Sequence, residues 1–198
     1  MHLTDADSPA LEDRDPEVVR KFQALVGALM YLTCFTRGEC SFTVNQCACF
    51  MSNPGPSHAE VTRRILRYLA GTRSQGITCA RGATDAGLTS TGRITMPNQL
   101  TASADADHAG AKDRRSVSGW SVMLNRSMVT WSSKRQPVTA ISSTESEFYA
   151  VSQCALDCVY LHWVMELMGH AQGQPTWIAQ DNVACIYLVK DVQPCQAH

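Results

Sequence analysis

Three acidic residues stand at the ends of predicted secondary-structure elements, and their placement constrains the fold more than any other feature of the chain. Asp105 closes an apolar run at residues 100–104. Asp181 closes a second run, at residues 177–180, and Glu147 opens a long helical pattern. Two strand ends and a helix start can meet at one edge of a sheet. We therefore expect the three carboxylates to lie within roughly 4–8 Å of one another, a spacing suited to shared divalent metal ions.

The C-terminal half alternates apolar and polar residues in short runs, which is the pattern of half-buried strands. Five strands are predicted, at residues 100–105, 116–124, 128–132, 138–142 and 176–180, with a hairpin turn at residues 125–126. A long helix follows the fourth strand, with Thr144 predicted as its N-cap and Glu147 at its third position. A short helix over residues 182–188 follows the fifth strand. This order predicts an α/β fold with a mixed five-stranded sheet flanked by helices.

The N-terminal half has helical periodicity instead, so we expect a small all-α segment to precede the sheet. Asp15 before Pro16 predicts the start of its first helix, and Ser57 with Glu60 predicts a capping box for its third. The predicted organisation is a disordered lead at residues 1–14, a helical segment at 15–80, a linker or loop at 81–98 and the sheet domain at 99–198.

Composition favours an intracellular globular protein. The 198 residues carry a net charge of −1, and 44% are apolar, which is enough for a packed core. The N-terminus lacks the basic and apolar regions of a signal peptide, and no uninterrupted run of about 18 apolar residues occurs, so we expect neither secretion nor a membrane partner. The nine cysteines lie mostly in apolar periodic segments, which indicates buried apolar side chains rather than disulfides.

Each acidic residue also has an ordinary structural interpretation. Glu147 suits a capping box, and Asp181 suits the N-cap of the helix that follows it. Asp105 and Asp107 suit a turn. Under this hypothesis the acids bind no metal and the chain is a structural spacer.

Two basic pairs follow the first acidic residue, Arg114-Arg115 and Lys134-Arg135. Clustered Lys and Arg side chains bind nucleic-acid phosphates, whereas the near-neutral net charge gives the whole chain no general attraction to nucleic acid. The alternative is that these pairs are solvated faces of hairpins.

Four motifs occur in order along the second half: residues 104–110 (ADADHAG), 114–120 (RRSVSGW), 131–137 (WSSKRQP) and 140–150 (AISSTESEFYA). Asp181-Asn182 follows these motifs. Together they resemble the ribonuclease H (RNase H) domain of copia-type LTR-retrotransposon Pol polyproteins, and the resemblance covers about residues 98–191. Three segments of the first half are similar to the end of the reverse transcriptase and its connection in those polyproteins, namely residues 22–32 (FQALVGALMYL), 50–54 (FMSNP) and 65–72 (ILRYLAGT). The chain has no polymerase-type Asp-Asp motif, so DNA synthesis is not expected.

The resemblance implies an RNase H-like fold and metal-dependent endonucleolytic hydrolysis of the RNA strand of RNA–DNA hybrids. It assigns the catalytic and metal-binding roles to Asp105, Glu147 and Asp181, with two Mg²⁺ ions, or Mn²⁺, as the cofactor. Asp105 would hold both ions and the other two acids one each. Glu147 matches the family's Glu, whereas Glu145 points about 200° away on the same helix.

The resemblance also implies the partners. The basic pairs Arg114-Arg115 and Lys134-Arg135 would contact the phosphates of the hybrid. The other partner would be the remainder of the reverse transcriptase polyprotein, in a cytoplasmic virus-like particle or in the nucleus.

Two departures from the family pattern bear on activity. His108 stands where the family commonly has Trp. The family's downstream basic segment and its fourth acidic residue have no counterpart up to His198, so the RNase H domain is expected to be C-terminally incomplete and weak or inactive. The alternative is a degenerate or domesticated retroelement remnant that acts as a non-enzymatic nucleic-acid-binding or assembly module.

Overall fold

A computed structural model describes residues 3–79, 87–88, 94–95, 98–108, 114–125 and 127–191. It divides the chain into two compact units, here called the helical unit (Met1–Ile77) and the sheet unit (Thr78–His198). Most of the linker predicted at residues 81–98 lies outside the described residues. Within it, β1 (Gly87–Leu88) pairs antiparallel with β2 (Ile94–Thr95).

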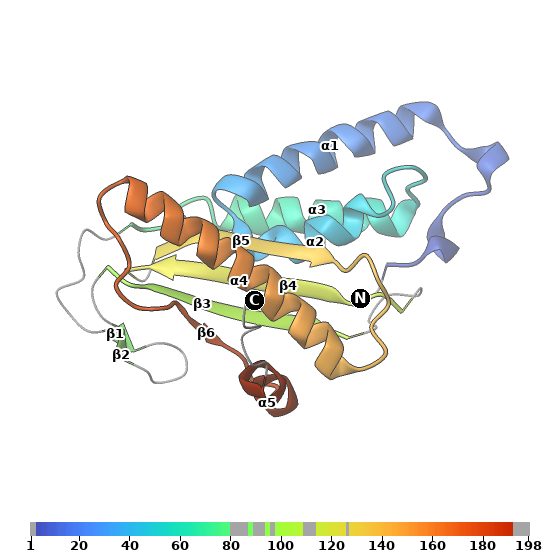
Figure 1. The fold of residues 1–198 in the computed structure, drawn as a ribbon. Helices are drawn as coiled ribbons and strands as arrows, with labels where there is room; N and C mark the ends of the chain where they lie inside the picture. Colours follow the sequence, from blue (N-terminus) through green and yellow to red (C-terminus); the bar gives the residue numbers. More distant parts are fainter. Residues whose placement is uncertain are drawn as a thin grey trace. The chain divides into compact units, whose positions relative to one another are not determined.

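The helical unit consists of α1 (Pro16–Phe35), α2 (Ser41–Ala48) and α3 (Pro56–Gly71), with a short 3₁₀ helix, η3 (Gly38–Cys40), before α2 (Figure 1). As predicted, Asp15 is the N-cap of α1, and its carboxylate accepts a hydrogen bond from the backbone N–H of Glu17. The apolar stripes of the three helices form one core, composed of Phe22, Val26, Leu29, Cys40, Val44, Cys47, Val61 and Ile65.

The capping box predicted for α3, Ser57 with Glu60, is wrong and lies two residues further along the chain than the one observed. Gly55 is the N-cap, and its backbone N–H donates to Nδ1 of His58 at 2.8 Å. Glu60 instead pairs with two arginines further along the helix, Arg63 and Arg67. His58 takes the capping role because its ring is fully buried and stacks on Phe50, with ring centroids 4.1 Å apart.

The predicted disordered lead also differs from the structure. Two short 3₁₀ helices, η1 (Asp5–Asp7) and η2 (Leu11–Asp13), occur there. Their loop is bound to Asn53, whose carbonyl accepts from Ser8 Oγ at 2.7 Å and whose side chain donates to the carbonyl of Pro9 at 2.9 Å. Disorder was predicted from composition, which carries no information about contacts with distant residues such as Asn53.

Gly55 is the point of closest approach between this lead and α3. A Cβ atom built at residue 55 would overlap the backbone carbonyl of Asp7. We expect Gly55→Ala to lower the stability of the helical unit by about 1–3 kcal/mol, the usual effect of overpacking, and to make the lead more susceptible to proteolysis. Gly71→Ala is the matched control, because a Cβ there meets no described atom within 4 Å and should stabilise α3 by up to about 1 kcal/mol. Equal melting temperatures for the two variants would contradict this account.

α1 is long and apolar enough to span a membrane, by length and composition only. By itself this is weak evidence, because the core helix of a soluble protein passes the same test. In the helical unit, α1 packs its Phe22, Val26 and Leu29 into the core.

The sheet unit is built on a four-stranded mixed sheet in the order β5-β4-β3-β6. β3 (Leu100–Asp107), β4 (Val117–Leu124) and β5 (Ser127–Arg135) form an antiparallel meander, and β6 (Trp177–Ala179) adds parallel to β3 (Figure 1). The hairpin turn was predicted at residues 125–126, and residue 126 lies outside the described residues. On either side of it, Leu124 of β4 pairs with Ser127 of β5, and Asn125 has a positive φ of 49°.

The strand predicted at residues 138–142, the fourth of the five, is wrong. Residues 138–142 form bends that connect β5 to the next helix. Val138 and Ile141, whose apolar character suggested a strand, are 56% and 93% exposed. Ala140 is the apolar residue of this segment that is buried.

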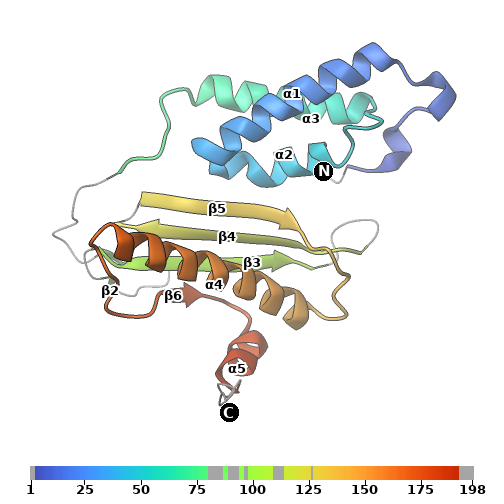
Figure 2. The same cartoon turned by 45° about the horizontal axis from the view of Figure 1, so that its top comes forward.

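α4 (Ser143–Leu167) lies across one face of the sheet, and α5 (Val183–Asp191) follows β6 (Figure 2). The interface between α4 and the sheet forms a second core, composed of Leu100, Ala102, Ala104, Val122, Ala150, Cys154, Cys158 and Met165. A hydrogen bond of 2.6 Å from Trp120 Nε1 to the Asp157 carboxylate also ties α4 to β4. The small alanines and cysteines allow the helix to approach the sheet closely.

Candidate active site

The register of β3 and β6 brings two of the predicted acids together. Ser103 pairs with Ala179, and Asp105 and Asp181 each follow two residues later along these parallel strands. Neighbouring strands lie about 4.8 Å apart, so the two side chains reach the same edge of the sheet. β6 itself ends at Ala179, and Asp181 therefore lies in the loop just beyond the strand.

The third acid comes from the sheet-facing side of α4. Glu147 precedes Ala150 by three residues and Cys154 by seven, so all three lie on the stripe that packs on the sheet. The predicted N-cap is wrong, since Ser142 rather than Thr144 fills it and accepts from the backbone N–H of Glu145.

Glu145 carries out the capping that was a possible role for Glu147. Its carboxylate accepts a hydrogen bond of 2.7 Å from the backbone N–H of Ile141. Glu147 is two residues further along and is 7% exposed. Helix capping therefore does not explain the position of Glu147.

Asn182 likewise carries out the capping that was a possible role for Asp181. Its side-chain oxygen accepts a hydrogen bond of 2.9 Å from the backbone N–H of Cys185, in the first turn of α5. Asp105 lies inside β3, paired with Gly119, and not in a turn. The structure thus assigns ordinary capping to neighbours of the predicted acids, and these observations argue against the spacer hypothesis.

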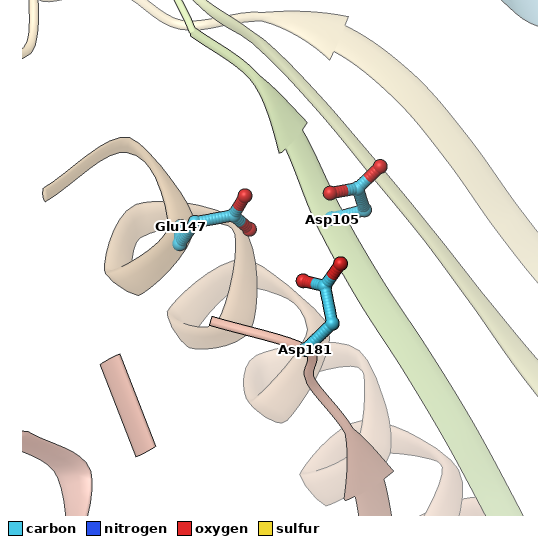
Figure 3. Close-up of side chains that lie close together, drawn as sticks. All are labelled: Asp105, Glu147 and Asp181. Atoms are coloured by element: carbon cyan, nitrogen blue, oxygen red, sulfur yellow. The ribbon is translucent and has the colours of Figure 1, made fainter. Parts of the chain in front are cut away.

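The three carboxylates converge. Asp105, Glu147 and Asp181 each offer an oxygen atom, and these atoms lie within 4.8 Å of one another. Figure 3 shows the side chains pointing toward a common space from β3, from α4 and from the loop after β6. Asp105 and Asp181 are exposed, so the space between the carboxylates is open to solvent. Hard carboxylate oxygens from three separate elements form a donor set that fits Mg²⁺ or Mn²⁺.

The electrostatics of the site also favour a cation. Burial raises the pKa of Glu147, and the charges of Asp105 and Asp181 raise it further. A hydrogen bond from Gln180 acts in the opposite direction and lowers it. Glu147 is therefore held among like charges in a partly dehydrated position, where a divalent cation would be stabilising.

This raised pKa predicts a pH dependence of stability. The folded state holds the Glu147 proton more tightly than the unfolded state does, so the contribution of this group is fully present below about pH 4.3, the ordinary Glu value, and is lost as the pH rises through the raised pKa. In metal-free buffer, we expect the melting temperature of the natural chain to fall relative to that of Glu147→Gln as the pH is raised from 5 to 8. Thermal scans in EDTA measure the difference. A difference that does not change with pH would contradict the assigned environment of Glu147.

Gln180 is a site residue that the sequence analysis missed. Its side-chain Nε2 donates to Glu147 Oε2 at 3.0 Å and to the carbonyl of Ala104 at 3.4 Å. Its Oε1 accepts from the backbone N–H of Asn182 at 2.8 Å. Its position next to Asp181 was the one sequence feature that could have suggested a role in the site. No sequence motif identifies a Gln at a strand end as the hydrogen-bond partner of a Glu on a helix.

The two predicted basic pairs lie at the Asp105 end of the sheet. Asp105 pairs with Gly119 on β4, and Gly119 pairs with Ser133 on β5. Lys134-Arg135 come directly after Ser133, at the end of β5. Since β5 is two strand spacings from β3, this pair is about 10 Å from β3. Arg114-Arg115 precede the start of β4 at this same end. All four side chains are exposed.

Comparison with known proteins identifies relatives over most of the chain. The retrovirus-related Pol polyprotein from transposon RE1 of Arabidopsis thaliana is 36% identical over 169 residues, which are 85% of this chain and 11% of that polyprotein. The corresponding polyprotein from transposon TNT 1-94 of Nicotiana tabacum is 30% identical over 154 residues, 77% of this chain and 10% of its own length. The secreted RxLR effector protein 161 of Plasmopara viticola is 36% identical over 141 residues, 71% of this chain and 90% of that protein.

No protein-family model and no solved structure matches the chain. The relatives define the class as retrotransposon-derived proteins. Within that class, the chain belongs to the family of retrovirus-related Pol polyproteins from copia-type transposons, as the sequence motifs predicted. It spans about a tenth of the length of the RE1 and TNT 1-94 polyproteins.

Proposed function

We propose that the sheet unit is the RNase H domain of a copia-type Pol polyprotein and hydrolyses the RNA strand of RNA–DNA hybrids. The observation that carries this proposal is the convergence of Asp105, Glu147 and Asp181, with oxygen atoms within 4.8 Å of one another. Neighbouring polar residues account for the helix caps, so the three acids are left for another role. A mixed α/β fold that presents acids at one sheet edge supports the same conclusion.

Asp105, Glu147 and Asp181 would together hold the two Mg²⁺ or Mn²⁺ ions. When bound, such ions neutralise charge at the scissile phosphate and lower the pKa of the attacking water. The residues of this chain contribute rigidity, because Asp105 is fixed by its strand and Glu147 by the packed stripe of α4. The two aspartates are exposed, as direct contact of bound ions with a substrate would require.

The basic pairs would hold the duplex. Arg114-Arg115 and Lys134-Arg135 are exposed at the Asp105 end of the sheet, where they would contact phosphates without selecting a base sequence. Discrimination of RNA from DNA would depend on the 2′-hydroxyl and on the shape of the minor groove. We further propose that the remainder of the polyprotein is a partner and that the protein acts in a cytoplasmic virus-like particle or in the nucleus.

A non-enzymatic module is the second candidate. The relative named as a secreted RxLR effector is matched over 90% of its own length and 71% of this chain, and its name is not that of a polyprotein. A domesticated remnant would keep the fold and bind nucleic acid or assemble with other proteins without cleaving hybrids.

A cleavage assay separates the two candidates. The substrate is a short RNA–DNA hybrid with a label on either strand, incubated with Mg²⁺, with Mn²⁺ or with EDTA, and double-stranded DNA is the control. We expect little or no cleavage by these 198 residues, because three carboxylates hold a second ion loosely. Metal-dependent cleavage of the RNA strand, and not of the DNA strand, should be recovered when a family-like C-terminal segment with a fourth Asp is appended. Binding of the hybrid without cleavage, even by the extended chain, would favour the non-enzymatic module.

A further inference from the structure

The carboxamide of Gln180 connects all three elements that carry the acids. It contacts Glu147 directly, through the 3.0 Å hydrogen bond to Oε2. It contacts β3 at the carbonyl of Ala104, the residue before Asp105. It contacts the chain after Asp181 at the backbone N–H of Asn182. Each of these contacts is at an acid or at its immediate neighbour in the chain.

The surrounding groups fix the orientation of this carboxamide. The Asn182 backbone N–H is a donor, so it requires the side-chain oxygen of Gln180. The amide nitrogen must then face the Glu147 carboxylate and the Ala104 carbonyl, which are both acceptors. Reversing the amide would place donor against donor and acceptor against acceptor, so a single orientation satisfies the network.

We propose that Gln180 is a positioning residue that sets the spacing of the three carboxylates and so controls the affinity of the site for divalent cations. This inference rests on the proposed function, because it concerns the same cation site. Binding of Glu147 Oε2 by Gln180 holds the carboxylate in one rotamer before a cation arrives. Partners of this kind, one step removed from a metal, typically change metal affinity or activity by about 10–100-fold when they are lost.

The test compares two identical substitutions in the full chain. Gln180→Met removes the carboxamide and keeps a side chain of similar length. Gln172→Met is the matched control, because Gln172 also ties two backbone groups of the sheet unit, accepting from Leu100 N–H at 3.0 Å and donating to the Asn98 carbonyl at 2.9 Å. It does so at the start of β3, the end of the strand opposite to Asp105.

The dissociation constant for Mn²⁺ is measured by the electron paramagnetic resonance signal of the free ion, and melting temperatures are recorded in EDTA. We expect Gln180→Met to weaken Mn²⁺ binding by about 10–100-fold, and Gln172→Met to leave it unchanged even if both variants melt at a lower temperature. If Gln180→Met does not fold, Gln180→Asn is used, since its shorter side chain cannot span Glu147 and Asn182 together and should also weaken binding.

The outcomes distinguish this inference from the proposed function. Equal Mn²⁺ affinity in the natural chain and the Gln180 variants would overturn the role of Gln180 and leave the cation site intact. Selective weakening in the Gln180 variants would support that role even if the chain cleaves no hybrid. Absence of Mn²⁺ binding by the natural chain would overturn both the cation site and the role of Gln180.

Discussion

Asp105→Asn is expected to raise the melting temperature of the metal-free protein and to abolish its stabilisation by Mg²⁺. Asp105 lies within 4.8 Å of two other carboxylates, and removing one of three like charges relieves their repulsion. In the natural chain, a cation at a hundred times its dissociation constant adds about 2.7 kcal/mol of stability, because it binds the folded state alone. For a chain of this size that corresponds to roughly 5–10 °C.

Thermal scans with EDTA and with millimolar Mg²⁺ measure both effects. Asp107→Asn is the matched control, since Asp107 is an exposed residue of the same strand, two positions further on, and is not one of the three converging acids. It should respond to Mg²⁺ as the natural chain does. A natural chain whose melting temperature is insensitive to Mg²⁺ would show that the three acids form no cation site.

Glu147→Gln is expected to eliminate the metal-dependent cleavage of RNA–DNA hybrid, whereas Glu145→Gln should retain it. Glu147 is one of the converging carboxylates, and Glu145 caps its own helix two residues earlier. Loss of a proposed cation ligand should reduce activity by more than the roughly 10–100-fold that follows from loss of an outer partner. Glu145→Gln should change stability little, because the amide oxygen can still accept the hydrogen bond from the backbone N–H of Ile141.

Both variants are made in the chain extended by a family-like C-terminal segment, because the unsubstituted extended chain is expected to cleave the hybrid more strongly. Hybrid cleavage is compared with hybrid binding for each variant. Binding should persist in both, because the proposed phosphate contacts come from Arg114-Arg115 and Lys134-Arg135. Equal loss of cleavage in both variants would mean that the helix start, and not the Glu147 carboxylate, is what activity requires.

Local patterns predicted the positions of most elements. Asp15 and Pro16 marked the start of α1 because a capping side chain and a fixed φ act within one turn. The alternation of apolar residues located β3, β4 and β5, and the last two pair antiparallel on either side of the predicted turn. The choice of Glu147 over Glu145 followed from the match to the family motif, and helical geometry added that only one of the two can face the site, because they point to different sides of the helix.

Choices between equivalent local signals were not predictable in this way. Ser142 and Thr144 are both good N-caps, and the structure uses Ser142, which makes Glu145 the capping acid. At α3 the N-cap is Gly55 and not the predicted Ser57, and the buried ring of His58 accepts the hydrogen bond from its backbone N–H. Ile141 had the character of a strand residue but is 93% exposed.

α4 illustrates the limit of periodicity. One side of the helix packs on the sheet through Ala150, Cys154 and Cys158, while its outer side exposes the apolar residues Leu156, Val159, Tyr160, Trp163 and Leu167. A helix that is apolar on two sides has no single stripe from which its packed side can be read.

The sequence by itself determined which residue types are present and roughly where each element begins and ends, because caps, turns and strand alternation depend on a few neighbouring residues. It also determined the family, through motifs that are local strings. The tertiary structure alone decided the register of β6 against β3, which sets Asp181 beside Asp105, and the contact of Gln180 with Glu147, a residue 33 positions away. Such contacts depend on how distant segments pack, and packing is a property of the whole sheet and helix rather than of any local pattern.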